Sequence, residues 1–95
     1  MDIAITSDGE VLKAIGRRLA HLRKGRDLTQ AEAAELAGVD RTTVSSGERG
    51  ENPTLLTVVR LLRVYGRLGA LESFIPEPDV SPMRLVREAR RSSGG

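Results

Sequence analysis

Four glycine residues divide most of this chain into short segments. In the stretches before the first and the last of them, apolar residues recur at three- and four-residue steps, the spacing of an amphipathic helix. The four are Gly25, Gly38, Gly50 and Gly66. Because glycine adopts the left-handed conformation that ends a helix more readily than other residues do, each is expected to stop a helix.

Helix start signals occur between these glycines. Ser7 and Thr29 each precede a glutamate by three residues, the pattern of a capping box, and Asp40 and Thr54 are single N-cap candidates. Together the signals predict helices over about 8–24, 30–36, 41–49, 55–65 and 68–74. The fourth has the broadest apolar face and is expected to lie in the core.

The scarcity of aromatic residues also favours helices. Aromatic residues make up 2% of the 95 residues, so the core has to be built from aliphatic side chains. The strands of a β-sandwich favour aromatic and β-branched residues. The sequence therefore predicts an all-α fold with five helices in one domain.

Both ends of the chain differ from this helical region. The segment 76–79 contains Pro76 and Pro78 and is predicted to be an extended linker, and a short basic helix with a local charge of +3 is expected over 83–91. We therefore divide the chain into a domain at 7–75 and a linker with a basic tail at 76–95. Near the start, the alternation of Ile3 and Ile5 is compatible with a short strand.

The composition excludes several classes of protein and site. The absence of cysteine rules out disulfides and thiolate zinc sites, and the single histidine leaves no basis for a metal site. No apolar stretch approaches the ~20 residues of a membrane helix, and neither a secretory leader nor a catalytic or phosphate-loop motif is present. We expect a cytoplasmic protein that is not an enzyme and has no cofactor.

Residues 28–50 carry the functional signal. Two short capped helices are joined by a turn of about four residues around Gly38, which is the helix-turn-helix arrangement. The second helix of this motif enters the DNA major groove by its N-terminal end. Val39 and Val44 are predicted to pack inward against Leu36 and the fourth helix. The side chains left facing outward are Arg41, Thr42, Ser45 and Ser46.

This motif and the helices around it resemble the XRE-type helix-turn-helix proteins, a family related to phage Cro and lambda-repressor domains. The resemblance covers roughly residues 11–74. The matching residues are Arg18, Arg23, Leu28-Thr29-Gln30, Ala34-Glu35-Leu36-Ala37-Gly38-Val39, Thr43-Val44-Ser45 and Glu48-Arg49-Gly50. It implies a five-helix lambda-repressor-like domain that binds double-stranded DNA.

The resemblance also implies roles for individual residues. Gln30 matches a glutamine that contacts a phosphate and braces the recognition helix, and Arg23 and Glu48 match a partly buried ion pair. Positions that read bases correspond to Arg41, Thr42 and Ser46, and positions that contact the DNA backbone to Thr43, Arg49 and Asn52. Among these, Arg41 suits base reading best, because a guanidinium that donates two hydrogen bonds to guanine contributes ~1–3 kcal/mol of discrimination.

Two residues near the recognition helix and one basic patch need a separate interpretation. Gly47 stands where the family has a large apolar residue, and because glycine within a helix costs ~1 kcal/mol relative to alanine, helix 41–49 is expected to be looser or shorter than usual. Asp40 would be repelled by phosphates, so we interpret it as a helix cap. The basic patch formed by Arg17, Arg18, Lys24 and Arg26 fits either a solvated face or DNA contact.

A single recognition helix reads too few base pairs for useful selectivity. We therefore expect a homodimer on a palindromic operator whose half-sites lie one helical turn, ~34–36 Å, apart. The predicted dimer surface is the helical face around Leu71 and Phe74, with pairing of the segments at 3–5 as the alternative.

The expected function is transcriptional autorepression. An antitoxin that represses its own operon, a restriction-modification controller and a phage-type repressor all remain open. The linker and basic tail loosely resemble those of HipB-like antitoxins encoded beside HipA-like kinase toxins, which indicates a toxin kinase as a partner at the tail. A protein-interaction adaptor without DNA binding is the alternative if Gly47 disables the recognition helix.

Overall fold

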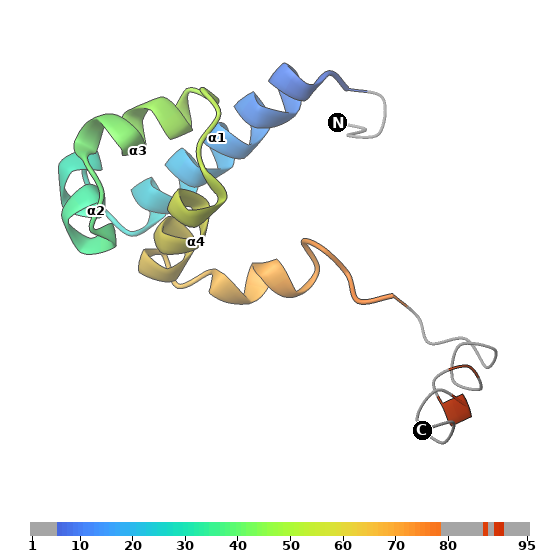
Figure 1. The fold of residues 1–95 in the computed structure, drawn as a ribbon. Helices are drawn as coiled ribbons and strands as arrows, with labels where there is room; N and C mark the ends of the chain where they lie inside the picture. Colours follow the sequence, from blue (N-terminus) through green and yellow to red (C-terminus); the bar gives the residue numbers. More distant parts are fainter. Residues whose placement is uncertain (1–5, 79–86, 88, 91–95) are drawn as a thin grey trace.

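The computed structural model describes residues 6–78, 87 and 89–90 of the chain. Within that part the elements are four α-helices, α1 (Asp8–Gly25), α2 (Gln30–Ala37), α3 (Arg41–Glu48) and α4 (Leu55–Val64), and a 3₁₀-helix, η2 (Leu68–Glu72) (Figure 1). No strand occurs among the described residues, so the predicted all-α fold is confirmed there. None of the helices in this part is both long and apolar enough to cross a membrane.

Two predicted elements fall on other parts of the chain. The strand at 3–5 lies outside the described residues. Of the basic helix at 83–91, only Arg87, Ala89 and Arg90 are described, and their backbone is helical. The remainder of that helix lies outside the described residues.

The first turns of the helices follow the predicted signals. Thr29 forms a complete capping box: its hydroxyl accepts the N–H of Glu32 at 3.0 Å, and the Glu32 carboxylate accepts the N–H of Thr29 at 2.9 Å. At the start of α1, Ser7 accepts the N–H of Glu10 at 3.3 Å, which is one of the two bonds predicted there. These side chains satisfy backbone donors that a helix leaves without partners.

The predicted helix stops are also present. Gly38, Gly50 and Gly66 have φ angles of 71°, 77° and 70°, in the left-handed region. Gly25 is the last residue of α1, but there the left-handed residue is Asp27, with a φ of 56°. The sequence therefore located all four helix ends, and at one of them an aspartate takes the conformation expected of glycine.

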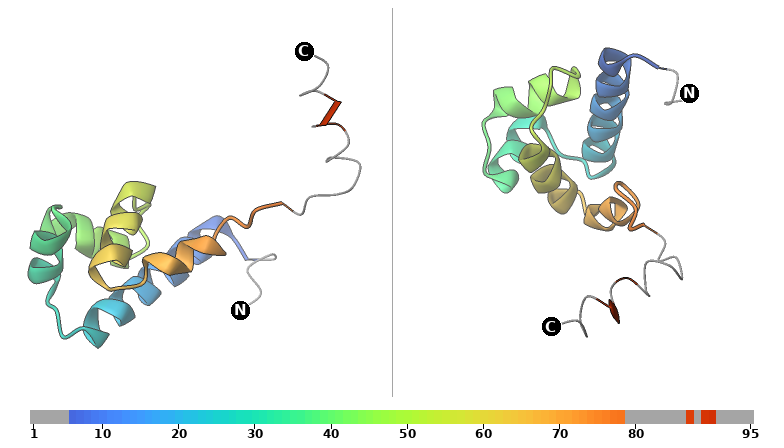
Figure 2. Two further views of the ribbon diagram at one scale, coloured as in Figure 1. Left: turned by 90° about the horizontal axis from the view of Figure 1, so that it is seen from below. Right: turned by 45° about the vertical axis from the view of Figure 1, so that its right-hand side comes forward.

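The helices enclose one aliphatic core. Helix α2 packs against α3 and α4, and α1 packs against α3. Figure 2 shows η2 on the side of α4 that is opposite to α2. The buried core residues are Leu19, Ala33, Ala34, Val44, Leu61, Leu62 and Tyr65. Since both helices of the turn motif contribute to this core, the motif is part of the folded domain and not an appendage.

Leu36 does not pack where the sequence suggested. Its side chain is 65% exposed, whereas Ala33 and Ala34 are buried, so α2 approaches the core through its alanines. The other half of the prediction is confirmed, because Val44 is fully buried and Val39 packs partly buried against the core. Ala33 and Ala34 fill the space on the inner side of α2, so Leu36 is left at the surface.

Glycine allows α1 and α3 to approach backbone to backbone. A Cβ atom placed on Gly16 would lie 2.5 Å from the carbonyl oxygen of Glu48 and 2.7 Å from that of Gly47. Gly47 is itself buried, and α3 continues through it to Glu48. The helix is therefore not interrupted at Gly47 and ends one residue before its predicted end, and a Cβ atom placed on Gly47 would meet only Cβ of Pro53, at 3.4 Å.

The fifth helix differs from its prediction. An α-helix was expected over 68–74, but the chain forms the short 3₁₀-helix η2, which ends at Glu72. Gly69 lowers helix propensity inside this segment, and Pro76 prevents continuation beyond it. As a result Phe74 and Ile75 lie past the helix, with 56% and 72% of their surfaces exposed.

The tyrosine of the core has a hydroxyl without a hydrogen-bond partner among the described residues. Tyr65 is 1% exposed, and its hydroxyl oxygen is buried. Burial raises the pKa of Tyr65 to about 12, with a further increase from the nearby charge of Glu48 and an opposing effect of Arg23. An unpaired buried hydroxyl costs about 1–3 kcal/mol.

We therefore expect Tyr65→Phe to leave the free energy of unfolding unchanged or to raise it by up to about 3 kcal/mol. Urea denaturation of the two proteins measures the difference. As a control, Leu61→Ala removes fully buried methyl groups and is expected to cost about 2–5 kcal/mol. A loss of stability in Tyr65→Phe comparable to that of the control would show that the hydroxyl has a partner.

Candidate nucleic-acid interface

The turn between α2 and α3 is fixed by backbone hydrogen bonds. Gly38 adopts the left-handed conformation at the end of α2, and the N–H of Val39 donates to the carbonyl of Ala34 at 3.0 Å. Val39 and Val44 then pack into the core on either side of the turn. Two helices of eight residues each are thus held at a fixed angle by a short connection, as a helix-turn-helix requires.

A buried ion pair holds α3 to α1. Arg23 donates to both carboxylate oxygens of Glu48, at 2.7 Å from Nε and 3.0 Å from Nη2, and the two side chains are 10% and 7% exposed. A third bond runs from Arg23 Nη1 to the carbonyl of Leu28 at 2.8 Å. The ion pair expected from the resemblance is present, and it also fixes the segment that leads into α2.

Gln30 completes this cluster from α2. Its side-chain amide donates to Oε1 of Glu48 at 3.0 Å. Burial alone raises the pKa of Glu48, but the hydrogen bonds from Arg23 and Gln30 and the Arg23 charge outweigh burial and hold that pKa below its ordinary value. Glu48 is therefore ionised at neutral pH. The bracing role expected of Gln30 is visible, while its expected phosphate contact stays a prediction.

The predicted base-reading residues lie along the outer side of α3. Arg41 and Thr42 are exposed in its first turn. Thr43, Ser45 and Ser46 are half-buried. The hydroxyl of Ser46 donates to the backbone carbonyl of Thr43 at 3.2 Å, so its proton is used within the helix. The two side chains with the greatest freedom to reach a base are thus at the N-terminal end of α3.

Asp40 does not cap α3 with its side chain. It occupies the N-cap position with extended backbone, but its carboxylate makes no capping hydrogen bond. The backbone carbonyl of Asp40 accepts from the N–H groups of Thr43 and Val44 at 3.0 and 3.2 Å. The sequence therefore located the start of α3 correctly, but the predicted capping hydrogen bond from the Asp40 side chain is absent.

Arg49 and Asn52 follow directly after α3. Asn52 is exposed and has a φ of 45°, a left-handed conformation that asparagine tolerates better than most residues. Arg49 donates to both carboxylate oxygens of Glu51, at 2.9 and 3.1 Å, and also to the hydroxyl of Ser45. Its guanidinium is thus already paired with a carboxylate at the place where a phosphate contact is predicted.

Glu51 should consequently weaken DNA binding. We expect Glu51→Gln to raise the affinity for any duplex several-fold at low salt. In the wild type, Arg49 has to give up its ion pair with Glu51 before it can bind a phosphate, and the Glu51 carboxylate also repels the phosphates. The substitution removes both effects. Fluorescence anisotropy with a labelled duplex of unrelated sequence measures this change. A matched control is Glu35→Gln, which removes an exposed carboxylate of α2 that makes no ion pair in the described part of the chain. Equal effects of the two substitutions would contradict a specific role for Glu51.

Sequence reasoning missed three residues that shape this interface. Gly16 sets the distance between α1 and α3, and Glu51 pairs with Arg49. Arg26, grouped with a basic patch, donates from Nε to the carbonyl of Tyr65 at 3.0 Å and so ties α1 to the end of α4. A usable signal existed for Gly16, since a glycine inside an apolar helical stripe usually has a packing reason. No group of histidine, aspartate or glutamate in the described residues has the arrangement of a metal site.

The arrangement defines a class of protein. Two short helices in a fixed turn, an exposed arginine at the start of the second helix and a second arginine just after it form a helix-turn-helix of the kind that binds DNA. The sequence profile of the helix-turn-helix domain family matches residues 14–74. The chain belongs to this family, within its XRE-type group of regulators.

Curated proteins of the same kind are similar in sequence. The HTH-type transcriptional regulator PuuR of Escherichia coli (strain K12) is 37% identical over 67 residues, which cover 70% of this chain and 35% of PuuR. The uncharacterized HTH-type transcriptional regulator y4dJ of Sinorhizobium fredii (strain NBRC 101917 / NGR234) is 36% identical over 58 residues, or 60% of this chain and 75% of y4dJ. The chain thus spans about a third of the length of PuuR and matches y4dJ over most of its length.

Proposed function

We propose that this protein is a sequence-specific DNA-binding repressor that binds a palindromic operator as a homodimer and regulates its own promoter. One observation supports this proposal above the others. Glu48 is bound from α1 by Arg23 and from α2 by Gln30, so α3 is held rigidly while Arg41 and Thr42 stay exposed at its free end. Preorganised presentation of a few side chains is what base reading requires.

The contacts divide into two kinds. Base edges are assigned to Arg41, Thr42 and Ser46, with Ser45 beside them as a further DNA contact, and the DNA backbone is assigned to Gln30, Thr43, Arg49 and Asn52. Arg41 is assigned guanine, because its guanidinium matches the two acceptors on the major-groove edge of that base.

A homodimer is the second component of the proposal. Two exposed apolar side chains support it, Leu55 at the start of α4 and Phe74 beyond η2, which line one apolar groove together with the partly buried Leu71. Burial of this surface by a second copy is favourable, and a two-fold axis would place two recognition helices on successive major grooves.

The narrower form of the proposal is an antitoxin that represses the operon it shares with a toxin kinase. The sequence of the linker and the basic tail supports this form, and most of that region lies outside the described residues. A kinase gene beside this one would favour it. A restriction endonuclease gene or a set of phage genes in that position would favour the other two contexts.

The test is a gel-shift titration of the purified protein on its own upstream DNA, with an unrelated duplex as competitor and salt varied. We expect a complex of two protomers per operator whose affinity falls steeply with salt, since phosphate neutralisation releases counterions. Absence of a specific complex at any salt concentration would reject the repressor and leave the adaptor as the better interpretation.

The assigned roles predict different results for two arginine variants. Arg41→Ala is expected to cost about 1–3 kcal/mol on the operator and to relax preference at one base position. Arg49→Ala is expected to weaken binding to operator and unrelated duplex by a similar factor, because phosphate contacts carry no sequence information. Competition titrations with single-base operator variants measure both effects. If the two variants lose the same selectivity, the division of roles is wrong.

A further inference from the structure

A groove on the face of α1 that is turned away from α3 contains arginines that form no ion pair with any of the described residues. This basic groove is lined by Arg17, Arg18, His21 and Arg67 around Leu22 and Leu62, and has a volume of about 640 Å³. Among the described residues, no acidic side chain lines it. The ion pairs of the described chain, Arg23 with Glu48 and Arg49 with Glu51, lie elsewhere. The groove therefore combines uncompensated positive charge with an apolar floor.

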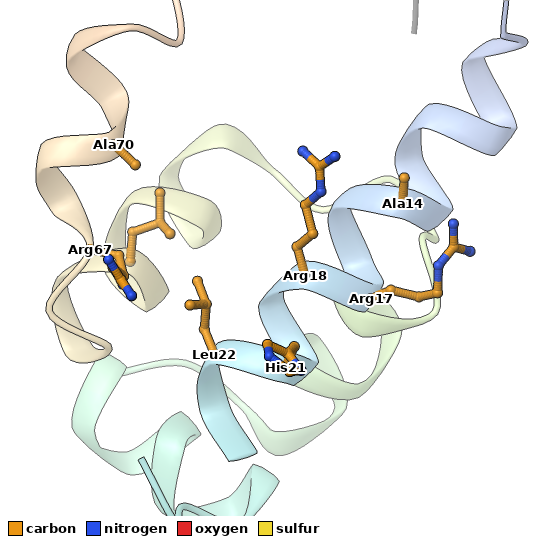
Figure 3. A pocket seen from close by; sticks show the side chains of 8 residues that line it. Ala14, Arg17, Arg18, His21, Leu22, Arg67 and Ala70 are labelled. Atoms are coloured by element: carbon orange, nitrogen blue, oxygen red, sulfur yellow. The ribbon is translucent and has the colours of Figure 1, made fainter. Parts of the chain in front are cut away.

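The side chains are arranged across the groove from two sides. In Figure 3, Arg18 and Leu22 project from α1 into the space that separates this helix from Arg67 and Ala70, whereas Arg17 points away from it. Arg18 and Arg67 thus face the same space from opposite walls. A ligand that satisfies both has to carry negative charge at its edges and apolar groups between them.

The basic groove continues into the apolar groove of the proposed dimer face. Arg18, Leu22 and Leu62 line both, and the second groove, of about 380 Å³, extends along α1 and α4 to Leu71 and Phe74. Anything bound at the basic groove is therefore in contact with residues that also form the wall of the dimer face.

We propose that the basic groove docks an acidic amphipathic segment of a partner protein, and that this docking displaces the second copy of the chain and lowers DNA affinity. The regulatory part of this statement rests on the proposed function. Arginine pairs with carboxylates through two parallel hydrogen bonds, and an amphipathic helix lays its apolar side into a groove of this kind.

Other occupants fit less well. The groove is open along its length, whereas small-molecule sites enclose most of their ligand. DNA would place phosphates against Leu22 and Leu62, and the groove is on the face of α1 turned away from the recognition helix. A second copy whose basic groove met this one would bring Arg17 and Arg67, neither of which lines the apolar groove of the proposed dimer face, against the same cations.

The first experiment uses a defined probe in the absence of DNA. A fluorescein-labelled helical peptide of leucine and glutamate, with leucine at i, i+3, i+4 and i+7, is titrated with the full chain and followed by anisotropy. We expect saturable binding that Arg18→Glu and Arg67→Glu each weaken by roughly tenfold or more, equivalent to 1.4 kcal/mol. A peptide with lysine in place of glutamate is expected not to bind.

Matched controls separate the groove from general attraction of charges. Arg60→Glu makes the same charge change at an exposed position of α4 outside the groove, and is expected to alter peptide affinity by less than about threefold. Arg18→Gln, which removes charge without adding a carboxylate, keeps the test informative if Arg18→Glu unfolds. Equal losses in Arg60→Glu and Arg18→Glu, or equal binding of the lysine peptide, would overturn the proposal.

The second experiment tests regulation and keeps the two proposals distinguishable. Addition of the acidic peptide to the complex of protein and operator is expected to release DNA from the wild type and not from Arg67→Glu, because Arg67 lines the basic groove and not the apolar groove of the proposed dimer face. Peptide binding in a protein that fails to bind any operator would reject the repressor and leave the docking site. Operator binding by a protein that ignores the peptide would reject the docking site and leave the repressor.

Discussion

Glu48→Ala is expected to lower the free energy of unfolding by about 3–5 kcal/mol, because it removes one partner of a buried ion pair. The reason is that Arg23, 8% exposed, would keep its charge in the interior without a carboxylate. A loss of this size is a large fraction of the total stability of a small domain. Denaturation in urea at pH 7 measures it.

The chain contains its own control for this prediction. Arg49 and Glu51 form an ion pair with the same fork geometry, but their side chains are 57% and 58% exposed. Glu51→Ala is expected to change stability by less than about 1 kcal/mol, because water solvates an exposed pair. Similar losses in the two alanine variants would mean that burial of the Arg23 and Glu48 pair has no energetic consequence.

The same pair should make stability depend on acid. Because the pKa of Glu48 is lowered in the folded state, its contribution is complete above the ordinary pKa of glutamate and is lost as the pH falls through the lowered value. The difference in unfolding free energy between wild type and Glu48→Gln should therefore shrink as the solution is acidified below that range. A difference that stays constant down to the lowest accessible pH would contradict the lowered pKa.

Gly16→Ala is expected to lower the free energy of unfolding by about 1–3 kcal/mol, although alanine is the better helix former. The added Cβ would overlap the carbonyl oxygens of Gly47 and Glu48, which are backbone atoms and cannot turn aside. Helix α1 would have to move away from α3, and operator affinity should fall with stability. Thermal unfolding and the gel-shift titration measure the two effects.

Gly9 provides the matched control on the same helix. A Cβ at Gly9 would meet no atom within 4 Å, so Gly9→Ala is expected to gain about 0.5–1 kcal/mol from helix propensity alone. The two glycine substitutions are thus predicted to have opposite signs. Gains in both would show that α1 and α3 separate without cost.

Most of the fold was predictable because its signals are local. Capping at Thr29 and the left-handed stops at Gly38, Gly50 and Gly66 depend on a few neighbouring residues, and each was found where the pattern indicated. The ion pair of Arg23 and Glu48 came from the family resemblance, since 25 residues separate the two in sequence.

The features that were missed depend on contacts between distant elements. Gly47 was interpreted as a gap because the local sequence does not reveal that Pro53 lies 3.4 Å from the place of its Cβ, nor that Gly16 brings α1 against its carbonyl oxygen. Leu36 was placed inside because a hydrophobic pattern does not show that alanines already fill the space beside α3 and α4. The pairing of Arg49 with Glu51 is a choice of rotamers, which no spacing rule determines.

The two ends of α3 are under different constraints, and this has an evolutionary consequence. Its C-terminal half holds Val44, Gly47 and Glu48, which are packed or bonded, while Arg41 and Thr42 at the other end are exposed. Under the proposed function, mutations at the exposed end change which operator is bound without a loss of stability that would remove the protein from the cell. Regulators with this division can acquire new target sequences after gene duplication, one surface residue at a time, while the scaffold is inherited unchanged.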